Sequence, residues 1–260
     1  MHRLRSTDIW FNSPGIQAAY QPINAPDALA ARQNVGNDGR MAGRNTAMPG
    51  VAPTHDPRSG WGFNGTTQYL DSGVIPSTDA TWSFLVRFSG VTAAGNLRCQ
   101  LGIGGGTLMN MYIIDVHSGT PGYGIFANRY YRASAYASLG SGIWGVAKAN
   151  LYRNGIFAGT LPTDGGGTTT TSFAIGALNG APISYYTNGS IQSILIASIT
   201  LSPAHLWQYS RQIAYCHVNP DWNAWARRRR YYYAPSQAAA AAFNPAWARN
   251  ANTVINQVHP

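Results

Sequence analysis

The chain has 260 residues, enough for one large all-β domain or for one domain with additional arms. Hydrophobic residues make up 45% of it and charged residues only 10%, well below the roughly 25% of an average soluble domain. The acids are nine Asp with no Glu, and no two Asp lie within six residues of each other. Since sugar hydrolysis usually needs two carboxylates, this composition argues against a glycoside hydrolase and predicts a protein that is not an enzyme.

The net charge of +9 is carried by seventeen Arg and Lys148. Such a charge permits binding to nucleic acid, anionic lipid or an acidic protein surface, and charge alone does not choose among these partners. Cys99 and Cys216 show no Cys-x-x-Cys spacing, and one long-range disulfide is the only pairing open to them. The basic N-terminus lacks the apolar stretch of a signal peptide, and no apolar run of 18 residues follows, so no membrane passage is expected.

The elements change character along the chain. Residues Tyr20 to Pro53 are polar and lack a sustained period, which indicates an arm with short strands. From His55 to about Leu201, short β-branched and aromatic runs alternate with Gly, Asn, Asp and Ser clusters, a pattern typical of a sandwich or barrel. The predicted strands are too many for one flat sheet, so two packed sheets are expected. They are Gly62–Asn64, Gln68–Leu70, Thr81–Phe88, Arg98–Ile103, Met109–Val116, Gly122–Ala127, Arg132–Ser138, Ala149–Arg153, Ile156–Thr160, Ser172–Ala177 and Gly189–Ser198.

Four Asn-Gly steps predict tight hairpins and a mostly antiparallel protein, because these residues readily take the positive φ angles of such turns. They are Asn64-Gly65, Asn154-Gly155, Asn179-Gly180 and Asn188-Gly189. In the run SFLVRF, Phe84, Val86 and Phe88 share one face and Leu85 and Arg87 the other. We expect the first face to be buried and the second to be at least partly wet.

A helix is predicted after the last strand. Ser202 is a suitable N-cap, Pro203 suits the first helical position, and Leu206, Tyr209, Ile213 and Cys216 recur at helical spacing until about Pro220. The basic and aromatic run ARRRRYYY, an alanine tract and a polar tail follow, and we expect this ending to gain order by packing on something else. The predicted division is an arm over 1–54, a sandwich over 55–201, a helix over 202–220 and a second arm over 221–260.

Several motifs resemble chemical sites without completing one. Asp115 and His117 share a strand face, but two ligands do not make a zinc site. His55 and Asp56 precede Pro57 and indicate a turn in which the Asp bonds backbone N–H groups. The glycine runs at 102–106 and 164–167 lack the Lys-Ser or Lys-Thr of a phosphate loop, and they are interpreted as flexible loops.

Tyrosine and arginine clusters are the candidate recognition residues. Tyrosine offers apolar area and a hydroxyl with little entropy to lose, so such clusters suit a protein interface or a glycan site. The run of four arginines could also neutralise phosphates, although a short run more often contacts an acidic protein patch. These candidates are Tyr130, Tyr131, Tyr185, Tyr186, Arg227, Arg228, Arg229, Arg230, Tyr231, Tyr232 and Tyr233.

The order of five blocks resembles the concanavalin A-like and laminin G-like sandwich, above all the versions in tailed-phage structural proteins. The blocks are GWGFNGTTQYLDSG, TWSFLVRFSG, LYRNGIFAGT, FAIGALNG and GSIQSILIASITLSPAHL, and the likeness covers about Tyr20 to Ile213. The resemblance implies a two-sheet antiparallel jelly-roll sandwich with a C-terminal helix and terminal arms. Hydrolytic members carry a Glu-x-Asp-x-Glu strand, which a chain without Glu cannot match. Calcium-binding members use Asp, Asn and carbonyl groups at one rim, and the sequence offers no full matching set. No cofactor is therefore predicted, and a structural calcium ion is left as an open alternative.

The first functional expectation is a virion structural protein, a capsid decoration or a head-fibre or tail component, made in the host cytoplasm. Its partners would be the major capsid protein or other virion proteins, together with further copies of itself. The alternative is a carbohydrate-binding module that attaches to a host-cell surface. Nucleic acid and membranes are not expected as partners, because the one arginine run and the absence of apolar spans offer little for either.

Overall fold

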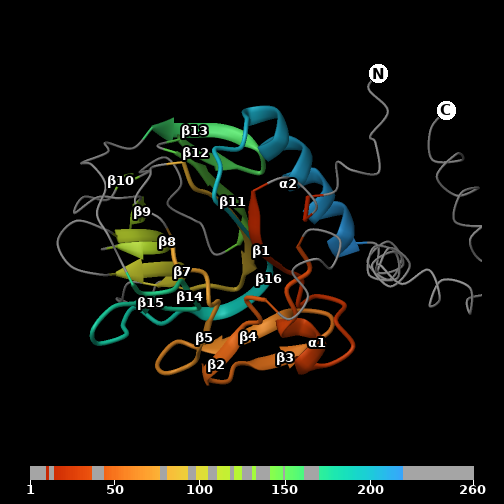
Figure 1. The fold of residues 1–260 in the computed structure, drawn as a ribbon, viewed down its shortest axis with the longest axis vertical. Coiled ribbons are helices and arrows are strands. Elements are labelled where there is room, and N and C mark those ends of the chain that lie inside the picture. The colour runs from red at the N-terminus through yellow and green to blue at the C-terminus, as the bar shows by residue number, and fades with distance from the viewer. Residues whose placement is uncertain are drawn as a thin grey trace, which may run out of the picture.

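Two β-sheets lie against each other, and a helix covers the outer face of one of them (Figure 1). The computed structural model describes residues 10–11, 15–36, 44–76, 81–92, 98–104, 110–117, 120–124, 131–132, 141–148, 150–160 and 170–218. Each sheet has eight strands within these residues, and nearly all neighbouring strands are antiparallel. The predicted all-β sandwich with a C-terminal helix is therefore confirmed.

The first sheet, sheet A, is built around the last strand of the chain. That strand is β16 (Asn188–Ala197), which pairs with β6 along one edge and with both β1 and β4 along the other. The sheet runs in the order β13-β12-β11-β6-β16-β4-β3, with β1 added beside β16. Its other strands are β1 (Ile16–Tyr20), β3 (Thr54–Asp56), β4 (Gly60–Asn64), β6 (Ser83–Ser89), β11 (Gly142–Ala147), β12 (Asn150–Arg153) and β13 (Ile156–Thr160).

The second sheet, sheet B, runs in the order β10-β9-β8-β7-β14-β5-β2, with the short β15 paired parallel to β7. This parallel pair is an exception to the antiparallel pattern. The strands are β2 (Met48–Val51), β5 (Tyr69–Asp71), β7 (Cys99–Gly104), β8 (Asn110–His117), β9 (Thr120–Gly124), β10 (Tyr131–Arg132), β14 (Ala174–Ile175) and β15 (Leu178–Asn179).

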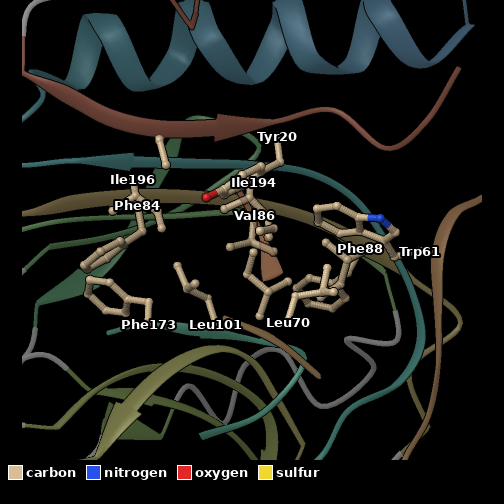
Figure 2. Close-up of a cluster of buried hydrophobic side chains, with 14 of the residues drawn as sticks. Tyr20, Trp61, Leu70, Phe84, Val86, Phe88, Leu101, Phe173, Ile194 and Ile196 are labelled. Atoms are coloured by element: carbon tan, nitrogen blue, oxygen red, sulfur yellow. The ribbon is translucent and has the colours of Figure 1, made fainter. Parts of the chain in front are cut away.

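The main core fills the space between the sheets (Figure 2). As the two-residue period of SFLVRF predicts, Phe84, Val86 and Phe88 of β6 all point into this core. Sheet B supplies Leu70 and Leu101 from the opposite side. Burial of these apolar side chains is the main favourable contribution to folding.

The reverse face of β6 is partly covered by other residues and partly exposed to solvent. Leu85 is fully buried in a second cluster, whereas Arg87 remains only partly buried. Helix α2 (Pro203–Val218) contributes Leu206, Tyr209 and Ile213 to this cluster, at the helical spacing that the sequence predicts. The predicted N-cap is confirmed, since the hydroxyl of Ser202 accepts the backbone N–H of His205 at 3.2 Å.

Only one of the four Asn-Gly steps forms the predicted tight hairpin. Asn154 and Gly155 both have positive φ and join the paired strands β12 and β13. The prediction is wrong for Asn64-Gly65, because β4 belongs to sheet A and β5 to sheet B, so this turn carries the chain between the sheets. It is also wrong for Asn179-Gly180, which lacks positive φ, and for Asn188-Gly189, which begins β16.

Strand β11 and helix α1 are among the elements that the sequence pattern does not predict. Strand β11 contains Gly142 and Gly145, and glycine within a run argues against a strand. A Cβ at Gly145 would lie 2.9 Å from Leu85 Cδ2, so this glycine lets the neighbouring strand's leucine pack against the backbone. The short helix α1 (Ala28–Arg32) begins at Asp27, whose carboxylate accepts the N–H of Ala30 at 2.7 Å.

Candidate functional site

The candidate site begins with Tyr69 on the outer face of sheet B. Tyr69 precedes Leu70 on β5, and Leu70 points into the core, so the tyrosine points the opposite way. Its ring lies across Gly50 of the edge strand β2, where an added Cβ would be 1.9 Å from Tyr69 Cζ. Glycine at this position therefore leaves room for the ring. The neighbouring Val51 lies opposite Tyr69 in register and is 46% exposed.

Tyr186 lies beside Tyr69, with the two ring centroids 6.4 Å apart and the planes tilted by 53°. Tyr186 follows a loop between Leu178 and Ser184 that two backbone hydrogen bonds close. The preceding Tyr185 has a φ of 54° and is 42% exposed. We call Tyr69, Tyr185 and Tyr186 the tyrosine platform. Its members come from strand β5 and from a loop more than a hundred residues later.

Arg98 holds this loop against the turn between the sheets. Its Nη1 donates to the carbonyl of Gly65 at 2.7 Å and to that of Tyr186 at 2.8 Å. The next residue, Cys99, donates its N–H to the carbonyl of Tyr185 at 2.8 Å. The two tyrosines are thus tied through their backbone to the start of β7, a rigid element, which suits a preformed binding surface.

The groups that the tyrosine platform offers are phenol hydroxyls and ring faces. The nearest acid in sequence is Asp71, whose carboxylate is engaged by the N–H of Gly73 at 2.8 Å and by the hydroxyl of Ser172. Tyrosine hydroxyls donate and accept hydrogen bonds, while the ring faces offer apolar area. Such a surface fits a ligand that combines C–H faces with hydroxyl groups.

The other sequence motifs have structural roles or lie outside the described side chains. Asp56 accepts the N–H of Arg58 at 2.8 Å, as its predicted turn requires, and this bond lowers the pKa of the exposed carboxyl. His55 lies 2.9 Å from the carbonyl of Pro22 through Nε2. Asp115 and His117 lie on β8, as predicted, but their side chains fall outside the described set.

The structure brings together only part of the predicted tyrosine and arginine candidates. Tyr186 lies beside Tyr69, which the sequence reasoning missed, and Tyr185 precedes Tyr186 in the chain. Tyr131 lies on β10 opposite Tyr123, with its side chain outside the described set. Tyr130 and the run from Arg227 to Tyr233 lie outside the described residues.

The described side chains include Cys99 and residues of the types that can bind a metal ion. Cys99 is a free thiol, fully buried, and burial raises its pKa far above the ordinary range. Among the described residues, no group of three His, Cys, Asp or Glu side chains is placed to hold a metal ion. No helix in that same part has both the length and the apolar character needed to span a bilayer.

A second exposed surface lies where strand β13 meets helix α2. Phe157 of β13 is 56% exposed and Trp207 of α2 is 49% exposed. The guanidinium of Arg211 lies 4.8 Å from the centre of a Trp207 ring, in cation–π geometry. We call Phe157, Trp207 and Arg211 the edge-helix patch. Strand β13 is also the outermost described strand of sheet A at this end.

Comparison with known proteins gives a fold and no family. No protein-family model matches the chain, and no curated protein matches it. The binding domain of botulinum neurotoxin serotype D has a TM-score of 0.51 at 10% identity, over 76% of this chain and 50% of that one.

Two other solved structures have TM-scores below 0.5. They are domain 4 of AbnA, a GH43 extracellular arabinanase from Geobacillus stearothermophilus in complex with arabinotriose (TM-score 0.47, 10% identity, 75% of this chain and 98% of that one), and the Ruminococcus gnavus sialidase CBM40 (0.41, 16%, 50% and 82%). At these identities the likeness concerns the fold alone. The fold of this chain is therefore similar to that of the neurotoxin binding domain.

Proposed function

We propose that this protein is a non-enzymatic β-sandwich that binds glycans through the tyrosine platform. The observation that carries the proposal is the pair of Tyr69 and Tyr186, whose rings lie side by side on the outer face of sheet B. Neither ring is fully buried, and the preceding Tyr185 is 42% exposed. Because a β-sandwich serves many functions, the proposal rests on this site and not on the fold.

The physical basis is contact between sugar C–H faces and aromatic rings. Each tyrosine has few rotatable bonds to freeze on binding, so it gives much apolar contact for a small loss of entropy. The site is already held by Arg98 and by the backbone of Cys99, so little reorganisation is needed. A carboxylate pair is not required for this activity. A purely binding role agrees with a chain that has no Glu.

Alanine at Tyr186 is expected to weaken glycan binding by at least about tenfold, which corresponds to about 1.4 kcal/mol. Alanine at Tyr69 should have a similar effect, because each ring is half of the same surface. Binding is measured by a glycan array, followed by titration calorimetry on the sugars that bind. Arabinotriose and sialyllactose are sensible first probes, since solved structures of similar fold contain them.

The matched control is Tyr215→Ala, which removes an exposed tyrosine from helix α2. Its affinity should equal that of the wild type. Thermal unfolding of all three variants checks that the sandwich stays folded. Wild-type protein that binds no sugar on the array, or platform variants that bind as well as Tyr215→Ala, would remove the basis of the proposal.

A second candidate function is a virion structural role, and the edge-helix patch favours it. Exposed large apolar side chains next to a sheet edge that no described strand pairs are typical of a protein contact. The five sequence blocks also resemble those of tailed-phage structural proteins. In this role the protein would bind other virion proteins or further copies of itself.

Serine at both Phe157 and Trp207 tests this second role through self-association. Wild-type protein should sediment as an oligomer at micromolar concentration, and the double variant as a monomer, because the patch would lose most of its apolar area. The Tyr186→Ala variant is the control and should sediment as the wild type. A monomeric wild type at high concentration would count against assembly through copies of this chain.

A further inference from the structure

Arg98 is a buried cation whose positive charge is not balanced within the described part of the chain. The residue is only 8% exposed, and its hydrogen-bond partners are the two carbonyls of Gly65 and Tyr186. Its Nε is buried without a hydrogen-bond partner. No carboxylate among the described residues forms an ion pair with it.

A buried charge without a partner lowers the stability of the folded protein. Removing a charged group from water is unfavourable, and buried charges are normally paired. Two carbonyl contacts satisfy one nitrogen of a guanidinium that has five N–H donors. An anion bound beside Arg98 would offset the remaining positive charge and accept a hydrogen bond from the guanidinium.

Within the described residues, one nitrogen of the guanidinium is free to donate a hydrogen bond to a ligand. Nη1 is occupied by the two carbonyls, and Nε is fully enclosed. Nη2 has no hydrogen bond to a described residue, yet it is not among the fully buried unsatisfied atoms. Nη2 therefore keeps some exposure to solvent, and its neighbour Nη1 bonds the backbone carbonyl of Tyr186.

We propose that Arg98 selects acidic sugars at the tyrosine platform, by donating from Nη2 to a carboxylate or sulfate of the glycan. This inference rests on the proposed function, since it assigns the ligand class of the same site. Hydrogen bonds to charged groups are about twice as strong as neutral ones, so one such contact can dominate specificity. The tyrosines would hold the ring of the sugar, and Arg98 its charge.

An acidic sugar fits this site better than a polyphosphate. Proteins that bind nucleic acid strongly use many phosphate contacts, spread over a groove or patch. Here one guanidinium bonds the backbone of a platform tyrosine, which suits one charge on one sugar. The overall charge of +9 still attracts polyanions in general, so the test includes one.

The experiment compares matched ligands on the full-length protein by titration calorimetry. The probes are lactose, 3′-sialyllactose, which adds a carboxylated sugar, 3′-sulfolactose, which adds a sulfate, and a thymidine decanucleotide. We expect at least one of the two acidic sugars to bind about tenfold more tightly than lactose. The ratio should shrink as salt rises from 20 to 500 mM, because a partly exposed charge pair is screened.

Three variants separate a specificity role from a purely structural one. Arg98→Gln should reduce the acidic-to-neutral ratio to about one while lactose binding persists. Arg98→Lys keeps the charge without the planar fork and should retain part of the ratio. Arg58→Gln removes an exposed arginine at the opposite end of β4 and should leave the ratio unchanged.

The outcomes separate this inference from the proposed function. Equal wild-type affinity for lactose and for both acidic sugars overturns the inference and leaves glycan binding standing. An Arg98→Gln protein that keeps the preference overturns it as well, as does a decanucleotide that binds tightly and depends on Arg98 as the sugars do. Absence of binding to every sugar overturns both. If Arg98→Gln does not fold, the wild-type preference and its salt dependence still decide.

Discussion

Replacing Phe173 by alanine is expected to lower the free energy of unfolding by about 3–5 kcal/mol. The side chain is 1% exposed and lies between the sheets against Phe84, with ring centroids 5.1 Å apart in an edge-on arrangement (Figure 2). Trp82 packs on it at 6.2 Å. Its backbone is pinned on both sides, since its N–H donates to Val74 and its carbonyl accepts from Ser72, so the site cannot collapse to fill the cavity.

Urea unfolding followed by tryptophan fluorescence measures this loss as a lower midpoint at unchanged slope. The control is Phe157→Ala, which makes the same chemical change at a side chain that is 56% exposed. We expect the control to lose about 1 kcal/mol or less. Equal losses in the two variants would mean that Phe173 does not lie in the packed core.

Alanine at Gly155 is expected to cost about 2–5 kcal/mol, the sum of roughly 1–2 for left-handed backbone and 1–3 for overpacking. Gly155 has a φ of 80°, which the β12–β13 hairpin requires. A Cβ there would lie 2.4 Å from the Cα of Trp207. Because that neighbour is helix backbone, α2 as a whole would have to move away from the hairpin.

Gly90→Ala separates the two causes of this loss. Gly90 has a similar φ of 69°, but its added Cβ would meet only the Cα of Gly189, at 3.9 Å. Its cost should be the backbone part alone, about 1–2 kcal/mol. The difference between the variants, measured by urea unfolding, reports the contact between hairpin and helix. Equal costs would show that α2 does not press on Gly155.

Local patterns predicted most of the fold. The alternation in SFLVRF placed Phe84, Val86 and Phe88 in the core, and Ser202 with its helical spacing predicted α2. The failures are nonlocal. Asn64-Gly65 has the turn chemistry of a hairpin, but partners elsewhere decide that its two strands belong to different sheets. Strand β11 was missed because Gly145 is required by Leu85, a residue sixty positions away.

Only part of the candidate site could be predicted from the sequence. Adjacent tyrosines made Tyr185 and Tyr186 visible in the sequence, but nothing local marks Tyr69 as their partner. Arg98 likewise stands alone in the sequence, and its importance comes from carbonyls on two distant segments. The virion role, the host-cell attachment and the part played by Arg227 to Tyr233 stay predictions, because they depend on partners or on residues beyond those described.

The measurement that tests glycan binding at the tyrosine platform most directly is a map of ligand-induced NMR chemical-shift changes. Isotope-labelled protein is titrated with the sugar that binds most tightly on the array. We predict that the largest changes fall on Tyr69, Tyr185, Tyr186 and the neighbouring Gly65 and Arg98, while the edge-helix patch at Phe157 and Trp207 stays unchanged. Changes confined to the edge-helix patch, or none at any sugar concentration, would contradict the account.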